Sequence, residues 1–236
     1  MVLINLQNVD QKLTLWPFVS LETGENYLGF EKECLKIGLK KHYKKGQVIT
    51  RVGDYVSGAY LLSKGKTVTT VMGQNGLEKT VYFCKAPWFF NDAPAALNQE
   101  ATMAVRALSD CVIVIINTND LNDLLHSDKS YLDLYLQYIS KRVYSIVNEL
   151  TEVWNLNPTQ IVFKVLVCFA IEQGISDNEQ VVVKITQEEL AQICGLHRVT
   201  VARTFKRLKE LDMIKKTNKS TVVMSSDLSF VSFYDL

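Results

Sequence analysis

The sequence predicts an α+β protein with three consecutive parts: a small β-roll, one long helix, and a C-terminal part built around two short helices. Three observations lead to this fold class. Short β-branched and aromatic runs separated by glycines fill residues 38–117, residues 127–155 contain neither Gly nor Pro, and two helical patterns meet at a glycine between residues 186 and 208.

The composition is that of a globular chain without a strong overall charge. The 236 residues are 47% apolar and 22% charged, and 26 Lys and Arg stand against 25 Asp and Glu, which gives a net charge of +1. Such a balance provides no general attraction to nucleic acid or to a membrane, so a nucleic-acid site has to be a local patch. No segment approaches the roughly 20 apolar residues of a spanning helix, and the first residues lack a secretion-signal pattern. We expect a cytoplasmic protein without a membrane partner.

The first part has the pattern of antiparallel strands with tight turns. The strand-like runs are VIT, AYLL, TVTTVM, KTVYF and CVIVII, and the turn glycines are Gly46, Gly53, Gly65, Gly73 and Gly76. Asn75-Gly76 is a strong hairpin-turn dipeptide, and the stretch from Val68 to Val71 predicts one buried and one wet face. Short strands of this kind close most simply as a small barrel or roll.

The second part is a single long helix with a heptad pattern. Its apolar positions are spaced by 4, 3, 4, 3, 4 and 3 residues at Leu132, Leu136, Ile139, Val143, Ile146, Leu150 and Val153. A period of 3.5 suits pairing with another helix, so we expect a parallel homodimer seam. The alternative is an amphipathic helix that lies on its own barrel. Asn157-Pro158 ends the helix and marks the expected domain boundary.

The third part contains a predicted helix-turn-helix. After the strand-like run VVVKI, Thr186 and Glu189 form a T-x-x-E capping box, and Gly195 ends the helix that this box begins. The next helix places Val201, Phe205 and Leu208 on one face, and its opposite face carries Arg198, Val199, Ala202, Arg203 and Lys206. Two helices joined by a short glycine turn are typical of DNA-binding proteins.

Local charge agrees with this interpretation. From residue 198 to residue 219 there are eight Lys and Arg but only Glu210 and Asp212 as acidic residues, a local balance of +6. A neutral protein with one basic segment fits an element that follows phosphates. The run KKTNKS separates two β-like stretches and predicts a winged hairpin. A solvated charged helix is the alternative.

Over essentially its whole length, the chain resembles the Crp-Fnr family of transcription regulators. The resemblance rests on the roll residues Gly46, Gly53-Asp54 and Gly65, on the long helix, on Asn157-Pro158-Thr159 and, above all, on ITQEELAQICGLHRVTVARTFKRL. It implies a double-stranded β-helix (jelly-roll-like) sensor domain at 1–126, a central dimerisation helix at 127–157 and a winged helix-turn-helix DNA-binding domain at 158–236. It also implies a dimer that binds pseudo-palindromic DNA and works with RNA polymerase.

The resemblance places the base-reading positions on Arg198, Val199 and Arg203. Arginine donates two hydrogen bonds to guanine, whereas Val199 cannot accept one from cytosine and suits a thymine methyl group. We therefore expect A·T-rich half-sites, with A·T at the step that faces Val199. The expected DNA contacts are Thr186, Gln187, His197, Arg198, Val199, Thr200, Arg203, Lys206 and Lys219.

The sensor departs from the cyclic-nucleotide binders of this family. Those proteins hold the phosphate with Gly-Glu followed, about ten residues later, by Arg-Ser or Arg-Thr. This chain has Phe90-Asn91-Asp92 and then Glu100-Ala101-Thr102, so the arginine is missing and acidic groups stand nearby. Because these groups repel an anionic phosphate, we expect an effector other than cyclic AMP.

Aromatic residues dominate the region where the family binds its effector. The chain is similar to the family branch that controls reductive dehalogenation and responds to chlorinated phenols. That branch uses a cation for the phenolate, and Lys141 or Arg142 would supply it here. The expected effector site is Tyr82, Trp88, Phe90, Asn91, Tyr138, Lys141 and Arg142. Each aromatic ring is alternatively part of the core of the roll.

Other functions find less support in the sequence. The five cysteines, at positions 34, 84, 111, 168 and 194, have no metal-ligand spacing and apolar neighbours, so we expect buried thiols and no metal or other cofactor. The N-terminal cysteine cluster of iron-sulfur relatives is absent, and no histidine is a convincing haem ligand. No catalytic motif is present, so we expect no enzyme. A redox- or gas-sensing regulator of the same fold and a cyclic-nucleotide-binding signalling module remain alternatives.

Overall fold

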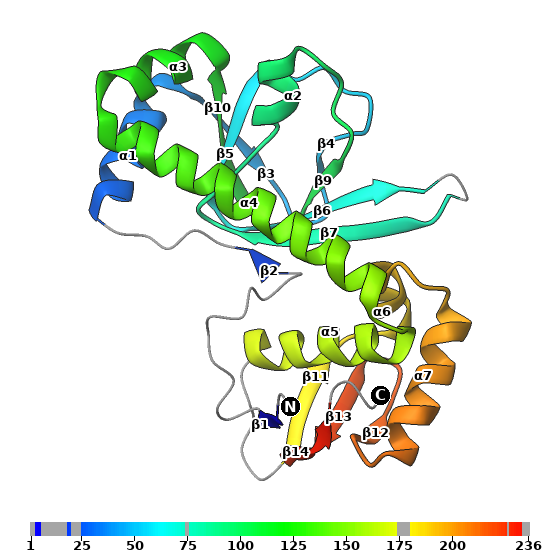
Figure 1. Ribbon diagram of the computed structural model, residues 1–236. Helices are drawn as coiled ribbons and strands as arrows, with labels where there is room; N and C mark the ends of the chain where they lie inside the picture. Colours follow the sequence, from blue (N-terminus) through cyan, green and yellow to red (C-terminus); the bar gives the residue numbers. More distant parts are fainter. Residues whose placement is uncertain are drawn as a thin grey trace. The chain divides into compact units, whose positions relative to one another are not determined.

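The computed structural model describes residues 3–5, 18–19, 25–73, 76–173, 180–225 and 227–232 (Figure 1). It divides into two compact units. One lies within Phe18–Gly73 and Thr80–Tyr144, and the other lies mainly within Ser145–Leu236. The long helix α4 (Lys129–Asn155) contributes to both units. The division into three domains, with a boundary at residue 157, stays a prediction.

The first unit is a roll of two sheets. The four-stranded sheet has the order β3-β10-β5-β8, and the five-stranded sheet has the order β2-β7-β6-β9-β4. Their strands are β2 (Phe18–Val19), β3 (Leu39–Tyr43), β4 (Val48–Thr50), β5 (Gly58–Lys64), β6 (Lys66–Met72), β7 (Glu78–Lys85), β8 (Trp88–Phe90), β9 (Ala104–Ala107) and β10 (Cys111–Asn117). Each strand-like run of the sequence lies in one of these strands, which confirms the predicted β-roll. Asn75, in the predicted hairpin turn, lies outside the described residues.

A close approach of two strands at Gly58 explains how the roll closes. Gly58 lies so near β10 that an added Cβ would come within 2.0 Å of the carbonyl oxygen of Ile116, so only glycine permits this strand pairing. The alternation predicted for Val68 to Val71 in β6 is wrong, because the neighbours Thr69 and Thr70, on opposite faces of the strand, are both buried, whereas Val68 is half-buried. The Oγ1 atom of Thr69 lies 4.0 Å from Sγ of buried Cys84.

Helices pack against the roll and complete its core. They are α1 (Glu25–Ile37), α2 (Asp92–Leu97), α3 (Thr118–Ser127) and the N-terminal part of α4. The predicted long helix begins at Lys129, slightly later than expected, because the Asp128 carboxylate accepts a hydrogen bond from the Ser130 amide at 2.8 Å and separates α3 from α4. From α4, the rings of Tyr131, Tyr135 and Tyr138 join the hydrophobic core.

The predicted heptad seam on α4 is divided between two environments. Leu132 and Ile139 pack against the core of the roll, which confirms part of the alternative interpretation. The seam residues Leu136, Val143, Ile146 and Leu150 are exposed, and the side chain of Val153 lies outside the described residues. The exposed apolar row of α4, a name we use for residues that share one stripe of the helix, consists of Leu136, Val143, Val147, Leu150 and Trp154.

The second unit is a winged helix-turn-helix. Its main sheet has the order β11-β13-β12, and β1 pairs with β14 (Figure 1). The elements are β1 (Leu3–Asn5), α5 (Pro158–Gln173), β11 (Gln180–Lys184), α6 (Gln187–Cys194), α7 (Arg198–Glu210), β12 (Ile214–Thr217), β13 (Thr221–Ser225) and β14 (Asp227–Ser232). The side chain of Asn157 accepts hydrogen bonds from the amides of Thr159 and Gln160, so α5 begins at the predicted break.

The local signals of the helix-turn-helix are confirmed. Thr186 Oγ1 accepts a hydrogen bond from the Glu189 amide at 3.1 Å, and the Glu189 carboxylate accepts one from the Thr186 amide at 2.8 Å. Gly195 ends α6 in the left-handed conformation with φ 65°. No helix in the part of the chain that the structure describes is long and apolar enough to cross a membrane.

Candidate DNA-recognition helix and sensor site

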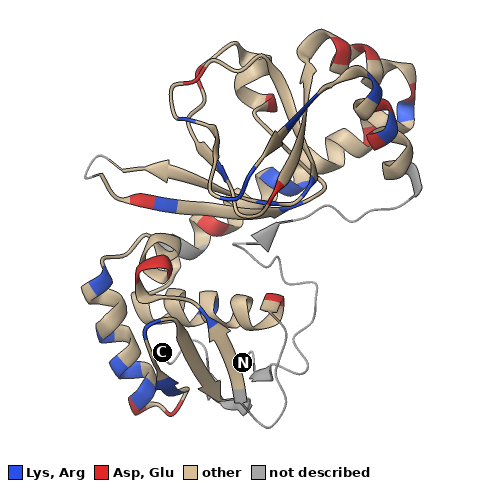
Figure 2. Ribbon diagram, turned by 180° about the vertical axis from the view of Figure 1, so that it is seen from behind, with Lys and Arg blue, Asp and Glu red and all other residues tan. Residues whose placement is uncertain are grey.

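Helix α7 has one buried face and an opposite face that is basic and exposed. Its side chains Val201, Phe205 and Leu208 are buried in the second unit. The predicted opposite face is exposed at Arg198, Val199, Ala202, Arg203 and Lys206. Figure 2 shows Lys and Arg along the length of this helix. Because the buried face holds α7 in place, its basic side chains are presented on a rigid element.

A groove of about 590 Å³ brings the start of α6, the start of α7 and the wing together. It is lined by Thr186, Gln187, Glu188, Arg198, Thr217, Asn218 and Lys219. Four of the nine predicted DNA contacts are therefore neighbours. Of the others, His197, Val199, Arg203 and Lys206 are exposed, and Thr200 is half-buried.

The groove also contains an acidic residue that sequence analysis did not select. Glu188 Oε2 lies 3.9 Å from Nε of Arg198, and both side chains are about 70% exposed (71% and 69%). An ion pair between side chains this exposed contributes little to stability, so Arg198 is free to exchange this partner for another acceptor.

The wing has a turn ordered by one side chain. Oδ1 of Asn218 accepts hydrogen bonds from the amides of Ser220 and Thr221 at 3.0 and 2.8 Å. Lys219 is exposed within this turn. The predicted winged hairpin is confirmed, and its lysine lies where β12 and β13 meet.

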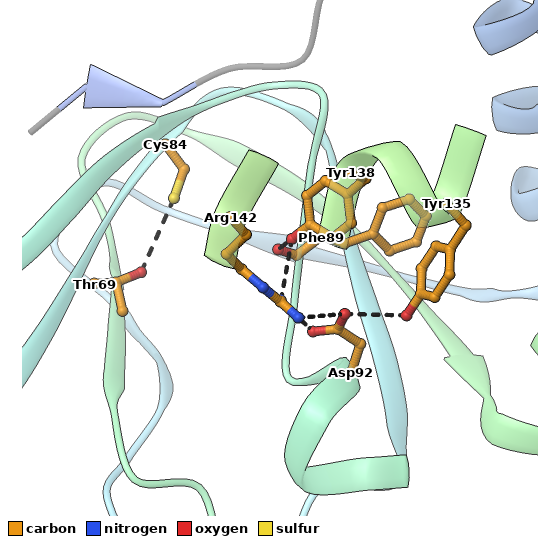
Figure 3. A network of polar contacts seen from close by, with 7 residues as sticks. All are labelled: Thr69, Cys84, Phe89, Asp92, Tyr135, Tyr138 and Arg142. Atoms are coloured by element: carbon orange, nitrogen blue, oxygen red, sulfur yellow. Dashed lines mark hydrogen bonds and ion pairs between the residues drawn. The ribbon is translucent and has the colours of Figure 1, made fainter. Parts of the chain in front are cut away.

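In the sensor unit, Arg142 of α4 and Asp92, the first residue of α2, form a buried ion pair (Figure 3). Nη1 of Arg142 lies 2.6 Å from Oδ1 of Asp92, and Nη2 lies 3.0 Å from Oδ2. The two side chains are 14% and 5% exposed. The Tyr135 hydroxyl donates a hydrogen bond to Oδ2 at 3.0 Å. Burial, and then the Asp92 carboxylate, raise the pKa of Tyr135, so this hydroxyl stays a donor at neutral pH.

The predicted aromatic residues lie around this ion pair and are also core residues. Tyr82, Trp88, Phe90 and Tyr138 are all buried. The ring centroids of Tyr138 and Trp88 are 4.9 Å apart, and Cζ of the Arg142 guanidinium lies 5.2 Å from the centroid of the Tyr138 ring. The Tyr138 hydroxyl donates a hydrogen bond to the carbonyl of Phe89. These aromatic rings therefore fill the interior of the roll, and their role as effector contacts stays a prediction.

The remaining predicted sensor residues differ in their surroundings. Asn91 is buried, has a left-handed backbone with φ 62°, and donates a hydrogen bond from Nδ2 to Thr50 Oγ1 at 2.7 Å. Lys141 is exposed and lines a small hollow between α1 and α4. The hollow is also lined by Tyr27 and Phe30 of α1, which sequence analysis missed because nothing local in α1 marks it as part of a site.

Two electrostatic expectations need correction. Asp92 does not stand as an unpaired negative charge that repels anions, because Arg142 neutralises it. For the same reason Arg142 does not offer a free cation to a phenolate, and only Lys141 of the two candidate cations is exposed. Sequence analysis missed the pair because its members are 50 positions apart and no short motif connects them.

The thiols behave as structural residues. All five cysteines are buried, and none of them forms a disulfide. Burial raises the pKa of Cys34, Cys84 and Cys194 to about 12, so these thiols are not thiolates at neutral pH and are poor nucleophiles. Among the described residues there is no group of three His, Cys, Asp or Glu side chains that could hold a metal ion.

Comparison with known proteins gives matches to both units. The model of the cyclic nucleotide-binding domain matches residues 40–128, and the model of the Crp-like helix-turn-helix domain matches residues 164–228. The cAMP-activated global transcriptional regulator CRP of Pasteurella multocida is 22% identical over 183 residues, which are 77% of this chain and 88% of that protein.

Solved structures show the same fold. The c-di-GMP-responsive global regulator CLP of Xanthomonas campestris matches with a TM-score of 0.75 and 18% identity, covering 84% of this chain and 99% of that chain. CprK complexed with OCPA matches with a TM-score of 0.67 and 17% identity, covering 92% of this chain and 98% of that chain. At these identities the likeness is one of fold.

Proposed function

The chain belongs to the Crp-Fnr family of effector-binding, DNA-binding transcription regulators, and we propose from this that it is a cytoplasmic homodimer. Its affinity for DNA would change when a small aromatic molecule binds the roll. Its operator would be a pseudo-palindrome with A·T-rich half-sites, and the bound protein would act on RNA polymerase. The effector need only bind one arrangement of the protein better than another to shift the population.

One observation carries the DNA-binding part of this proposal. The side chains at the predicted base-reading positions, Arg198, Val199 and Arg203, are exposed on a helix that is fixed by its buried face. Lys206 and Lys219 add positive charge beside them and suit phosphate contacts. Substitution of a base-reading side chain should change the sequence preference, whereas substitution of a phosphate-binding side chain should weaken binding to all sequences alike. Binding measurements therefore separate the two roles.

The experiment is a selection from random duplexes followed by binding measurements. We expect enrichment of a pseudo-palindrome with A·T at the step facing Val199. Arg203→Ala is expected to lose about 1–3 kcal/mol and to relax the preference at one base pair, whereas Lys206→Ala should weaken all sequences alike and lower the salt slope by about 1. These values are measured by mobility shift at several salt concentrations.

Lys36→Ala serves as the control, because it removes one positive charge from an exposed ion pair in α1. It should leave the affinity for DNA unchanged. A selected site with G·C opposite Val199 would refute the assignment of that residue. Equal losses for Arg203→Ala on all sequences would reduce Arg203 to a phosphate contact.

The aromatic character of the effector is proposed from the sensor residues. The phosphate-binding Arg-Ser of cyclic-nucleotide binders is replaced by Ala101-Thr102, and Ala101 is buried. The aromatic side chains of the roll suit a planar apolar ligand. CprK, a protein of the same fold, was solved as a complex with OCPA. The effector proposed for this chain is a halogenated phenol-like molecule, and the proposed biological role is control of reductive dehalogenation.

A thermal-shift screen tests the effector class. We expect stabilisation by a substituted phenol and none by cyclic AMP. A ligand at 100 times its dissociation constant stabilises a protein by about 2.7 kcal/mol, which is readily measured. Stabilisation by cyclic AMP instead would favour a cyclic-nucleotide-responsive regulator, like the cAMP-activated CRP of Pasteurella multocida. If neither compound stabilises the protein while DNA binding is intact, this result would argue against an aromatic effector.

A further inference from the structure

We propose that Asp92 occupies the position where an anionic effector binds, so that the effector enters by displacing Asp92 from Arg142. The ligand class is an aromatic anion, such as an arene carboxylate or a phenolate. This inference rests on the proposed effector-responsive function and specifies what the effector must do inside the sensor.

The geometry of the ion pair supports competition for one binding edge. Both carboxylate oxygens of Asp92 are engaged by the two terminal nitrogens of Arg142, at 2.6 and 3.0 Å. A guanidinium binds any carboxylate through the same planar fork. With one side chain 14% exposed and the other 5% exposed, the pair is shielded from water, and an anion can use this edge of the guanidinium only by replacing the Asp92 carboxylate.

A second observation points to a ligand in the same layer of side chains. Nε1 of Trp88 is fully buried and has no hydrogen-bond partner among the described residues. A buried indole N–H normally finds an acceptor. The Trp88 ring contacts the ring of Tyr138, over which the Arg142 guanidinium lies. Because these rings fill the layer, an aromatic ligand has to part them to enter, and one of its oxygen atoms would then provide the acceptor that Nε1 of Trp88 lacks.

Asp92 keeps one polar partner when it leaves Arg142. Its Oδ2 also accepts a hydrogen bond from the Tyr135 hydroxyl, which remains after displacement, while the contacts of the effector with Arg142 have to offset the lost ion pair (Figure 3). The preceding residue is anchored separately through the bond from Asn91 to Thr50. Since Asp92 begins α2 and Arg142 belongs to α4, the exchange would loosen the tie between these two helices. Effector binding would thereby be linked to the position of α4.

The test compares ligands that differ in charge. Binding of 3-chlorobenzoate and of its uncharged counterpart 3-chlorobenzamide is measured by titration calorimetry on the full chain without DNA. Asp92→Asn removes the competing charge with little change in shape. We expect it to bind 3-chlorobenzoate roughly tenfold or more tightly than the wild type does and to leave the affinity for 3-chlorobenzamide unchanged.

Two variants complete the experiment. Glu33→Gln removes a carboxylate from an exposed pair with Lys36 in α1 and should not alter either affinity. The double variant Asp92→Asn/Arg142→Met carries no buried unpaired charge and should lose the gain for 3-chlorobenzoate. Unchanged or weaker binding of 3-chlorobenzoate by Asp92→Asn, an equal gain for both compounds, or no binding to any variant would each overturn the proposal.

DNA binding by the same proteins keeps this test separate from the proposed function. If the mobility shift on the selected operator persists while the charge effect is absent, the inference on Asp92 fails and the DNA-binding function stands. If the charge effect is present but no specific DNA is bound, the ligand site stands and the proposed function fails.

Discussion

Leu150→Glu is expected to convert the protein into a monomer and to weaken operator binding by about 100-fold or more. Leu150 belongs to the exposed apolar row of α4 and is 69% exposed, so the substitution removes little packing within the chain. In a homodimer, the row would be buried and a charge there would stand in an apolar seam. A monomer contacts only one half-site, so it loses the gain in affinity that comes from binding both half-sites at once, which is about 10²–10⁴-fold. Sedimentation and mobility-shift measurements provide the two readouts.

A matched substitution on the same helix supplies the control. Gln137 is exposed but lies away from the exposed apolar row, so Gln137→Glu introduces the same charge without touching the proposed seam. It should remain dimeric and bind the operator normally. A dimeric Leu150→Glu protein would show that the row has another use.

Arg142→Met is expected to lower the free energy of unfolding by about 3–5 kcal/mol. The substitution leaves the Asp92 carboxylate buried, with only the Tyr135 hydroxyl as a polar partner at its side chain. Removing one member of a buried pair is costly because the other charge stays uncompensated. Urea unfolding of the full chain, followed by fluorescence, measures the loss.

The double variant Asp92→Leu/Arg142→Met distinguishes charge from packing. Replacement of both members by apolar residues is often close to neutral, so this protein should recover most of the loss. Lys36→Met breaks an exposed pair and should change stability by less than about 1 kcal/mol. If Arg142→Met were as stable as the wild type, the pair would have no structural role.

Elements that depend on neighbouring residues could be predicted from the sequence. The capping box of Thr186 and Glu189, the turn at Gly195 and the break at Asn157-Pro158 are all local, and the structure has them at those positions. The roll strands and the two faces of α7 follow from side-chain periodicity. These signals need no knowledge of distant residues, which is why they are reliable.

Features that depend on distant residues could not be predicted. Asp92 and Arg142 meet across 50 positions, and only the fold brings α2 to α4. The heptad pattern of α4 gives the apolar positions but not what covers each, so it could not separate Leu132 and Ile139, which face the roll, from exposed Leu150. Burial of Thr67 and Thr69 in place of valines likewise depends on which face of β6 turns inward.

The two faces of α7 have a consequence for how such a regulator can diverge. Val199 is 62% exposed, whereas Val201, next but one in the chain, is fully buried. Substitutions at exposed positions such as Val199 usually change stability by no more than about 0.5 kcal/mol. If Val199 reads the operator as proposed, operator preference can drift among gene copies through single substitutions that the fold tolerates, while the buried face keeps the helix in place. The same division makes α7 a suitable scaffold for engineering new operator specificities.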